Sequence, residues 1–276
     1  MTQGRRRSWL FVPGADAAAH AAAARSGADV VVLELEDFTP PDLRAKARAL
    51  AGEAFSRWRE AGAIAAVRVN PLETCGRDDL RVVMLARPDV VMMSKVVTAD
   101  QVRSLAELAP DAELVPNVET AAGLMNAFHI GKASPRVTAM LMASEDMVAD
   151  LGTARSRGGE ELAYVRARFL VECRAAGVEA IDCPYTFSDV KGAAADARYA
   201  KRLGYRMKSL VDPSHARAIN DVFTPGKAEL AKARKIVAAF EKVRAAGKER
   251  VKVDGALIEV PIYAAAKRLL ESAARS

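Results

Sequence analysis

The chain has 276 residues, of which 51% are hydrophobic, 28% charged and 5% aromatic. This composition excludes an intrinsically disordered protein, because the chain can bury enough apolar surface to offset the entropy lost on folding. The net charge of +6 is spread along the sequence apart from Arg5–Arg7, which argues against a nucleic-acid partner. Apolar runs are far shorter than the ~20 residues of a membrane span, and no secretory signal is evident. We therefore expect a cytoplasmic protein that binds neither membranes nor nucleic acid.

Cysteine and histidine chemistry is not indicated. The three cysteines, Cys75, Cys173 and Cys183, are odd in number and widely spaced, which argues against a disulfide framework and fits a reducing compartment. The three histidines are also far apart along the chain. Zinc sites built from closely spaced Cys and His are therefore not expected.

Short apolar runs alternate with helical stretches from the first strand onward. Most runs are rich in Val, Ile, Leu or Met without strict alternation, as is typical of parallel strands covered on both faces. The predicted strands are Ser8–Val12, Val30–Leu35, Ile64–Val69, Val90–Val96, Leu114–Glu119, Val137–Ala143, Ala180–Cys183 and Met207–Val211. The predicted helices between them include Asp16–Ser26, Pro41–Ala61, Ala99–Ala109, Glu160–Ala176 and Val190–Leu203.

This alternation predicts an α/β protein with a (β/α)8 TIM barrel over residues 1–225. A doubly wound sheet is the rival, but it would normally carry a glycine-rich phosphate turn, and the sequence has neither GxGxxG nor GxxxxGK[ST]. Residues 226–276 are expected to form a C-terminal helical extension or lid. It contains helices at Lys227–Ala246 and Ile262–Ala274 with a mixed segment, Lys248–Pro261, between them.

Polar residues follow the apolar runs at the same relative position in several repeats. In a TIM barrel the carboxyl ends of the strands meet on one face, where catalysis takes place. The residues at these ends are Pro13, Gly14, Glu36, Asp37, Arg68–Asn70, Lys95, Asn117–Glu119, Ser144–Asp146, Asp182–Tyr185 and Asp212.

Glu119 and Asp146 follow neighbouring predicted strands and should face the same cavity. Two carboxylates without imidazole form an oxygen site suited to Mg²⁺. Such an ion could hold a 2-oxo or 2-hydroxy acid and stabilise an enolate as a Lewis acid. The alternative is that both residues simply occupy the first turns of helices, where acidic residues are favoured. Their placement on adjacent strands favours metal binding.

Arg68 could hold a substrate carboxylate through two parallel hydrogen bonds, or pair with Glu36 or Asp37 on the adjacent strand. Glu36 and Asp37 are expected to order Arg68 and metal-bound water. Lys95 could form a Schiff base with a carbonyl substrate. Neutralisation of the surrounding carboxylates is the favoured role for Lys95.

The ordered set of strand-end motifs resembles the citrate lyase beta subunit (CitE-like) branch of the HpcH/HpaI aldolases. The matching segments are Ser8–Gly14, Leu33–Asp37, Val67–Asn70, Lys95–Val96, Glu119–Ala121, Ser144–Asp146, Ala149–Gly152, Ala180–Asp182, Pro184–Tyr185, Asn220 and Phe223–Pro225. Together they span nearly the whole predicted barrel.

The resemblance implies a lyase in which Glu119 and Asp146 bind Mg²⁺ and Arg68 and Glu119 contact the substrate. Pro13, Gly14 and Lys95 are further candidates for substrate binding, and Glu36 and Asp37 for catalysis. Leu257–Pro261 is similar to a segment whose acidic residue acts in a neighbouring subunit, with Glu259 where aspartate is usual. The family is commonly trimeric, so a homotrimer is expected.

The expected activity is cleavage of a β-hydroxyacyl thioester of the citryl-, malyl- or citramalyl-CoA class. The family usually carries basic residues after the position of Gly14 that help hold the CoA phosphates, whereas here Ala15–Ala24 is nearly uncharged. A metal-dependent aldolase acting on free hydroxy-oxo acids therefore stays open as an alternative. So do a Schiff-base enzyme using Lys95 and a non-catalytic ligand-binding homologue.

Overall fold

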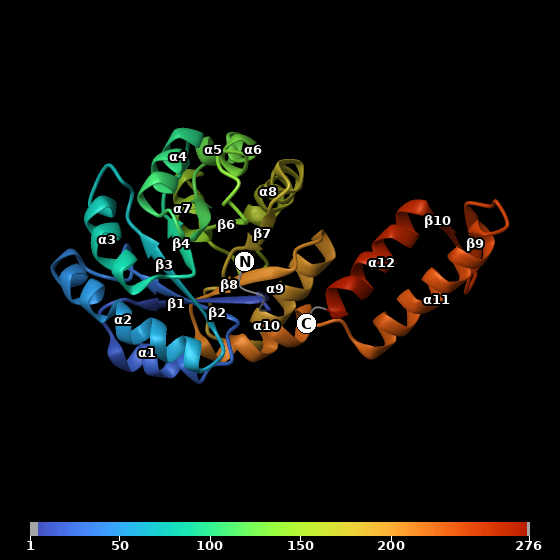
Figure 1. Ribbon diagram of the computed structural model, residues 1–276, viewed down its shortest axis with the longest axis horizontal. Coiled ribbons are helices and arrows are strands. Elements are labelled where there is room, and N and C mark those ends of the chain that lie inside the picture. The colour runs from blue at the N-terminus through green and yellow to red at the C-terminus, as the bar shows by residue number, and fades with distance from the viewer. Residues whose placement is uncertain (1–4, 275–276) are drawn as a thin grey trace. The chain divides into compact units, whose positions relative to one another are not determined.

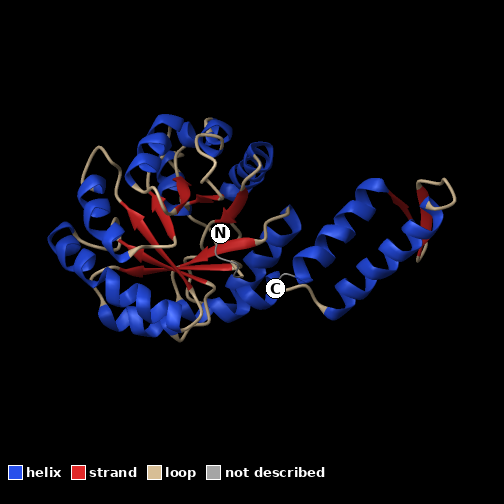
Figure 2. Ribbon diagram, in the orientation of Figure 1, coloured by secondary structure: helices blue, strands red, loops and turns tan. Residues whose placement is uncertain are grey.

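The computed structural model describes residues 5–274 of the chain and forms a closed barrel of eight parallel strands. Each strand pairs with the next along the chain, and β1 pairs with β8 to close the ring. Figures 1 and 2 show these strands surrounded by helices. The predicted (β/α)8 barrel is therefore confirmed. Its strands are β1 (Ser8–Pro13), β2 (Val30–Glu34), β3 (Ile64–Val69), β4 (Val90–Met93), β5 (Glu113–Val118), β6 (Ala139–Met142), β7 (Glu179–Asp182) and β8 (Met207–Leu210).

Helices connect the strands and cover the outside of the ring. Left-handed glycines end two of them, Gly177 after α8 and Gly204 after α9. The α-helices of this part are α1 (Ala17–Ala24), α2 (Arg44–Glu60), α3 (Gly76–Val83), α4 (Ala99–Leu108), α5 (Ala121–Met125), α6 (Ala127–Gly131), α7 (Ser144–Asp150), α8 (Ala163–Ala176), α9 (Val190–Leu203) and α10 (Ala216–Phe223). Short 3-10 turns lie at Pro41–Leu43, Met84–Ala86, Glu160–Leu162 and Pro213–His215.

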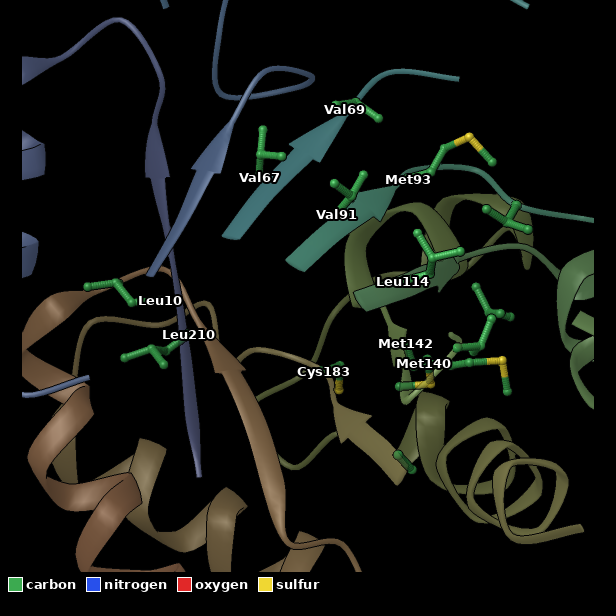
Figure 3. Packing of buried hydrophobic residues seen from close by; sticks show 14 of the residues in the cluster. Leu10, Val67, Val69, Val91, Met93, Leu114, Met140, Met142, Cys183 and Leu210 are labelled. Atoms are coloured by element: carbon green, nitrogen blue, oxygen red, sulfur yellow. The ribbon is translucent and has the colours of Figure 1, made fainter. Parts of the chain in front are cut away.

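Alternate residues of each strand belong to two separate apolar cores. Trp9, Phe11 and Met92 belong to the core inside the barrel, whereas residues such as Val67 and Met93 pack against the surrounding helices (Figure 3). Both faces are buried, which explains why the strands read as continuous apolar runs. The same alternation decides which polar side chains at the strand ends point into the barrel.

Asp182 is one strand-end residue that points away from the inside of the barrel. Its carboxylate accepts hydrogen bonds from Arg166 on α8 at 2.9 and 2.7 Å and from Lys208 Nζ at 2.6 Å. Both cations also pair with Asp196 on α9. This buried ion cluster joins β7 and β8 to their helices, so the expectation that Asp182 faces the candidate active site is wrong.

The chain divides into two compact units, one ending at Phe223 and the other beginning at Thr224. The second unit contains α11 (Lys227–Arg244), the antiparallel pair β9 (Arg250–Val253) and β10 (Ala256–Glu259), and α12 (Val260–Ala274). Phe240 on α11 stacks on Tyr263 of α12, with ring centroids 4.6 Å apart. In residues 5–274 we find no helix with the length and apolar character that crossing a membrane requires.

Candidate active site

Arg68 lies at the carboxyl end of β3 and points into the barrel, held by two carboxylates of the adjacent β2 segment. Its Nε donates a 2.9 Å hydrogen bond to Glu34 Oε1, and its Nη2 lies 3.2 Å from Glu36 Oε2. Burial alone would lower the pKa of Arg68, but these carboxylates outweigh it and raise the pKa above its usual value. Arg68 is therefore a fixed, buried cation.

Glu34, which is not among the predicted site residues, holds this arrangement together. It is fully buried, and its carboxylate also accepts hydrogen bonds from the backbone N–H groups of Glu36 at 2.7 Å and Phe38 at 2.6 Å. It therefore shapes the loop after β2 and orients Arg68. Glu34 shares the inward-facing side of β2 with Val30 and Val32. The other side of β2 is apolar as well, so the sequence alone does not tell which of the two sets faces inward.

Lys95 brings a second cation to the same carboxylates. Its Nζ donates to Glu36 Oε1 and lies 3.7 Å from Asp37 Oδ1. Burial opposes the charge on Lys95, but the bond to Glu36 outweighs it and raises the pKa of Lys95. A protonated amine is a poor nucleophile, so this environment favours charge neutralisation over Schiff-base formation.

Glu119 and Asp146 follow the neighbouring strands β5 and β6, as the sequence predicts. Glu119 is fully buried; its Oε1 accepts from the backbone N–H of Lys95, while its Oε2 has no hydrogen-bond partner. Burial is the main reason that the pKa of Glu119 rises to about 8, Arg68 opposes the rise, and the charges of Asp146 and Glu36 add to it.

Asp146 lies in the first turn of α7 and is half-buried. Burial raises its pKa, Asp37 raises it further, and Lys95 opposes the change. The charge of Asp146 in turn raises the pKa of Glu119. A carboxylate whose pKa is raised by a neighbouring carboxylate is typical of a site that takes up a cation. The candidate site therefore combines the carboxylates of Glu119 and Asp146 with two nearby cations, Arg68 and Lys95.

The residues of this site fit a hard divalent cation with few protein ligands. The Oε2 of Glu119 is a buried carboxylate oxygen that accepts no hydrogen bond from the protein. Within residues 5–274, no group of three or more His, Cys, Asp or Glu residues is arranged to hold a metal. Mg²⁺ is commonly bound by one or two carboxylates while water and substrate complete its octahedron. Glu119 and Asp146 therefore match Mg²⁺ better than a zinc site.

Pro13 and Gly14 follow β1 and bring that loop close to β2. Gly14 N donates 3.0 Å hydrogen bonds to Glu34 O and Thr39 Oγ1. A Cβ at position 14 would lie 2.6 Å from Glu34 O, so only glycine fits here. These contacts give Gly14 a role in closing the loop beside the site.

Glu259 lies on β10 in the second unit, where its side chain is exposed. Glu259 is thus a candidate catalytic residue of the second unit, whereas Arg68 and Glu119 belong to the first unit.

A known protein family matches the barrel of this chain, and known proteins are similar to it over nearly its whole length. The model of the family described as HpcH/HpaI aldolase/citrate lyase matches residues 7–213. The chain is 31% identical to the citrate lyase subunit beta of Leuconostoc mesenteroides subsp. cremoris, over 97% of this chain and 93% of that protein. It is 34% identical to a (3S)-malyl-CoA thioesterase of Cereibacter sphaeroides, over 92% and 89%.

A solved structure extends this similarity to the second unit. The CitE protein of Mycobacterium tuberculosis, in complex with magnesium, acetoacetate and coenzyme A, matches with a TM-score of 0.80 at 26% identity, covering 99% of both chains. The resemblance inferred from the strand-end motifs is thus confirmed. The chain belongs to the HpcH/HpaI aldolase/citrate lyase family.

Proposed function

We propose that the protein is a Mg²⁺-dependent carbon–carbon lyase that cleaves a β-hydroxyacyl thioester of the citryl-, malyl- or citramalyl-CoA class into a 2-oxo acid and an acyl thioester. The observation that carries the proposal is the buried, unpartnered Oε2 of Glu119, which lies in the same site as Arg68 and Asp146. The 31%-identical relative is a citrate lyase subunit, and the CitE structure contains magnesium and coenzyme A.

Glu119 and Asp146 would hold the ion. When bound, Mg²⁺ acts as a Lewis acid toward the oxygens of the 2-oxo acid portion. The protein's other residues bind and orient this portion. Arg68, fixed by Glu34 and Glu36, binds the substrate carboxylate through its guanidinium.

The cleavage step moves one proton and one electron pair. The β-hydroxyl loses its proton as the carbon–carbon bond breaks, and the hydroxyl carbon becomes the carbonyl of the 2-oxo acid. The electron pair of the broken bond passes to the acyl thioester as an enolate, which then takes up a proton at carbon. An acidic side chain that accepts and returns the proton balances the reaction.

We assign this proton transfer to Glu259 of a neighbouring subunit in a homotrimer. The exposed position of Glu259 on β10 supports the assignment, as do the exposed apolar residues Leu257, Val260 and Ile262 around it, because such side chains are typical of surfaces that bind another protein. The three cysteines are free thiols, which fits the proposed cytoplasmic setting.

Two alternatives have specific support. Helix α1, Ala17–Ala24, contains no lysine or arginine to hold CoA phosphates, which favours an aldolase acting on free hydroxy-oxo acids. The relative that is 34% identical is a thioesterase, which favours hydrolysis of malyl-CoA. A non-catalytic protein that binds an oxo acid with Mg²⁺ is the outcome if no thioester or free acid is turned over.

Substitution of the two carboxylates tests the proposal. Glu119→Gln and Asp146→Asn should abolish Mg²⁺-dependent cleavage and Mg²⁺ binding measured by calorimetry, because each removes an anionic ligand. Glu145→Gln is the matched control, since Glu145 is adjacent in sequence but exposed and paired with Arg155. Wild-type turnover in either of the first two variants would overturn the assignment.

A further inference from the structure

Asn117 is a buried polar side chain for which the protein provides no partner. It lies on β5, its side chain is fully buried, and neither Oδ1 nor Nδ2 makes a hydrogen bond. The backbone around it is firmly held, because Asn117 O accepts from Val96 N at 3.1 Å. A buried amide without partners is rare in folded proteins and calls for a specific explanation.

The strand register places Asn117 in the same layer as Arg68. In a TIM barrel, side chains from alternate strands form layers across the interior. In the strand register, Arg68 on β3 is opposite Glu34 on β2, and Glu34 is opposite Pro13 on β1. The Arg68 guanidinium nevertheless lies 5.2 Å from the ring centroid of Phe11, which is two residues before Pro13. Two side chains of one layer that come from alternate strands are therefore shifted by two residues relative to the strand register.

The same two-residue shift, applied from β3 toward β5, leads to Asn117. In the strand register, Arg68 is opposite Met92 on β4, and Met92 is opposite Val115 on β5. Two residues beyond Val115 is Asn117, on the inward-facing side of β5 that also carries Glu119. Asn117 and Arg68 thus lie at the base of the candidate active site, above the apolar interior.

The surroundings of Asn117 favour an apolar residue. Val115 lies two residues before Asn117 on the same face of β5, and Leu141 on β6 is the register partner of Asn117. Val115 and Leu141 both belong to the interior apolar core. A leucine of similar volume would avoid an unsatisfied amide at this position. An asparagine that weakens the core is typical of a position selected for binding.

We propose that Asn117 is a positioning residue whose Nδ2 donates a hydrogen bond to the carboxylate of the bound 2-oxo acid, beside Arg68. This inference rests on the proposed function, in which Arg68 binds that carboxylate. A carboxylate has about four lone-pair directions, and the guanidinium of Arg68 occupies at most two of them. Asn117 would then recognise the acid end of the substrate at the deepest point of the site.

Direct binding measurements test this role without turnover. Oxaloacetate is titrated into the full-length protein by calorimetry with saturating Mg²⁺. Asn117→Leu should weaken oxaloacetate binding about 10- to 100-fold, as expected for the loss of one hydrogen bond to a charged group. Asn117→Asp should weaken it at least as much, because a second carboxylate repels the ligand. Leu141→Met is the matched control for a change of packing in the interior and should bind as wild type does.

Thermal unfolding of the metal-free protein gives an independent readout. The Asn117→Leu variant should melt at a higher temperature than wild type, because it removes an unsatisfied amide from the core. A lower melting temperature would show that Asn117 has a structural partner and would overturn the proposal.

The binding outcomes distinguish a failure of the role assigned to Asn117 from a failure of the proposed function. Wild-type affinity in Asn117→Leu overturns the role of Asn117 and leaves the proposed function standing. Wild-type affinity in Asn117→Asp shows that no amide donor is required at this position and overturns the assignment of Nδ2 as a donor to the ligand carboxylate. Failure of the wild-type protein to bind oxaloacetate with Mg²⁺ contradicts the proposed function as well.

Discussion

Glu34 offers a sharp test of how the candidate site is held together. In the Glu34→Gln variant one carboxylate oxygen becomes an NH2 group, which then faces N–H donors. The carboxylate of Glu34 accepts from Arg68 Nε, Glu36 N and Phe38 N at 2.9, 2.7 and 2.6 Å. Its side chain is fully buried, so water cannot replace the lost bonds.

The expected loss of stability follows from the burial of this pair. Removing one partner of a buried ion pair costs about 3–5 kcal/mol. The lower value applies here because Glu36 still lies 3.2 Å from Arg68. A loss of about 3 kcal/mol corresponds to a fall in Tm of about 6–12 °C for a unit of this size.

The assay is thermal unfolding in EDTA, followed by oxaloacetate titration with Mg²⁺. Glu53→Gln is the control, because Glu53 pairs with Arg57 on the exposed surface of α2 and such pairs contribute less than about 1 kcal/mol. Oxaloacetate affinity should fall about 10-fold in Glu34→Gln, as Arg68 loses its orientation. A Tm within about 2 °C of wild type, together with unchanged affinity, would refute this reasoning.

Three further predictions concern charge and assembly. Because the pKa of Glu119 in the metal-free fold is raised from 4.5 to about 8, its contribution to stability is fully present below pH 4.5 and is lost as the pH rises through about 8. Melting curves in EDTA should show this loss in wild type but not in Glu119→Gln, and Mg²⁺ binding should release a proton below about pH 8. Lys95 is held protonated by Glu36, so borohydride with pyruvate should leave the protein mass unchanged, and an adduct on Lys95 would establish Schiff-base chemistry instead. Light scattering should give a trimer, and Glu259→Gln should lower kcat more than it alters KM; a fully active monomer would exclude a role for Glu259 in a neighbouring site.

The strands were predictable because each is a short apolar run bounded by turn residues. All eight expected runs contain most of the corresponding strand, and the polar residues at or just beyond their carboxyl ends include Arg68, Glu119 and Asp146. Burial on both faces removed the alternation that tells inward from outward positions. This is why Glu34 was missed and Asp182 was wrongly placed at the site.

The hairpin of the second unit lies within Lys248–Pro261, for which the sequence analysis predicts no strand, although its turn has a sequence signal. Val253 pairs with Ala256 across the two-residue turn Asp254-Gly255, and both turn residues have positive φ, at 50° and 81°. Asp-Gly between apolar residues is typical of a type I′ hairpin turn. The hairpin was therefore readable, whereas no sequence pattern reveals that Asn117 lacks partners, since that depends on the packing of neighbouring strands.

The proposed lyase activity is tested by measuring Mg²⁺-dependent cleavage of thioesters. The EDTA-treated protein is incubated with malyl-, citramalyl- and citryl-CoA, and the 2-oxo acid and the acyl-CoA product are both quantified as Mg²⁺ is added back. We expect Mg²⁺ to restore cleavage of at least one of these thioesters, with the two products in equal amounts. Release of free CoA without a 2-oxo acid, or no reaction on any of the three at saturating Mg²⁺, would contradict it.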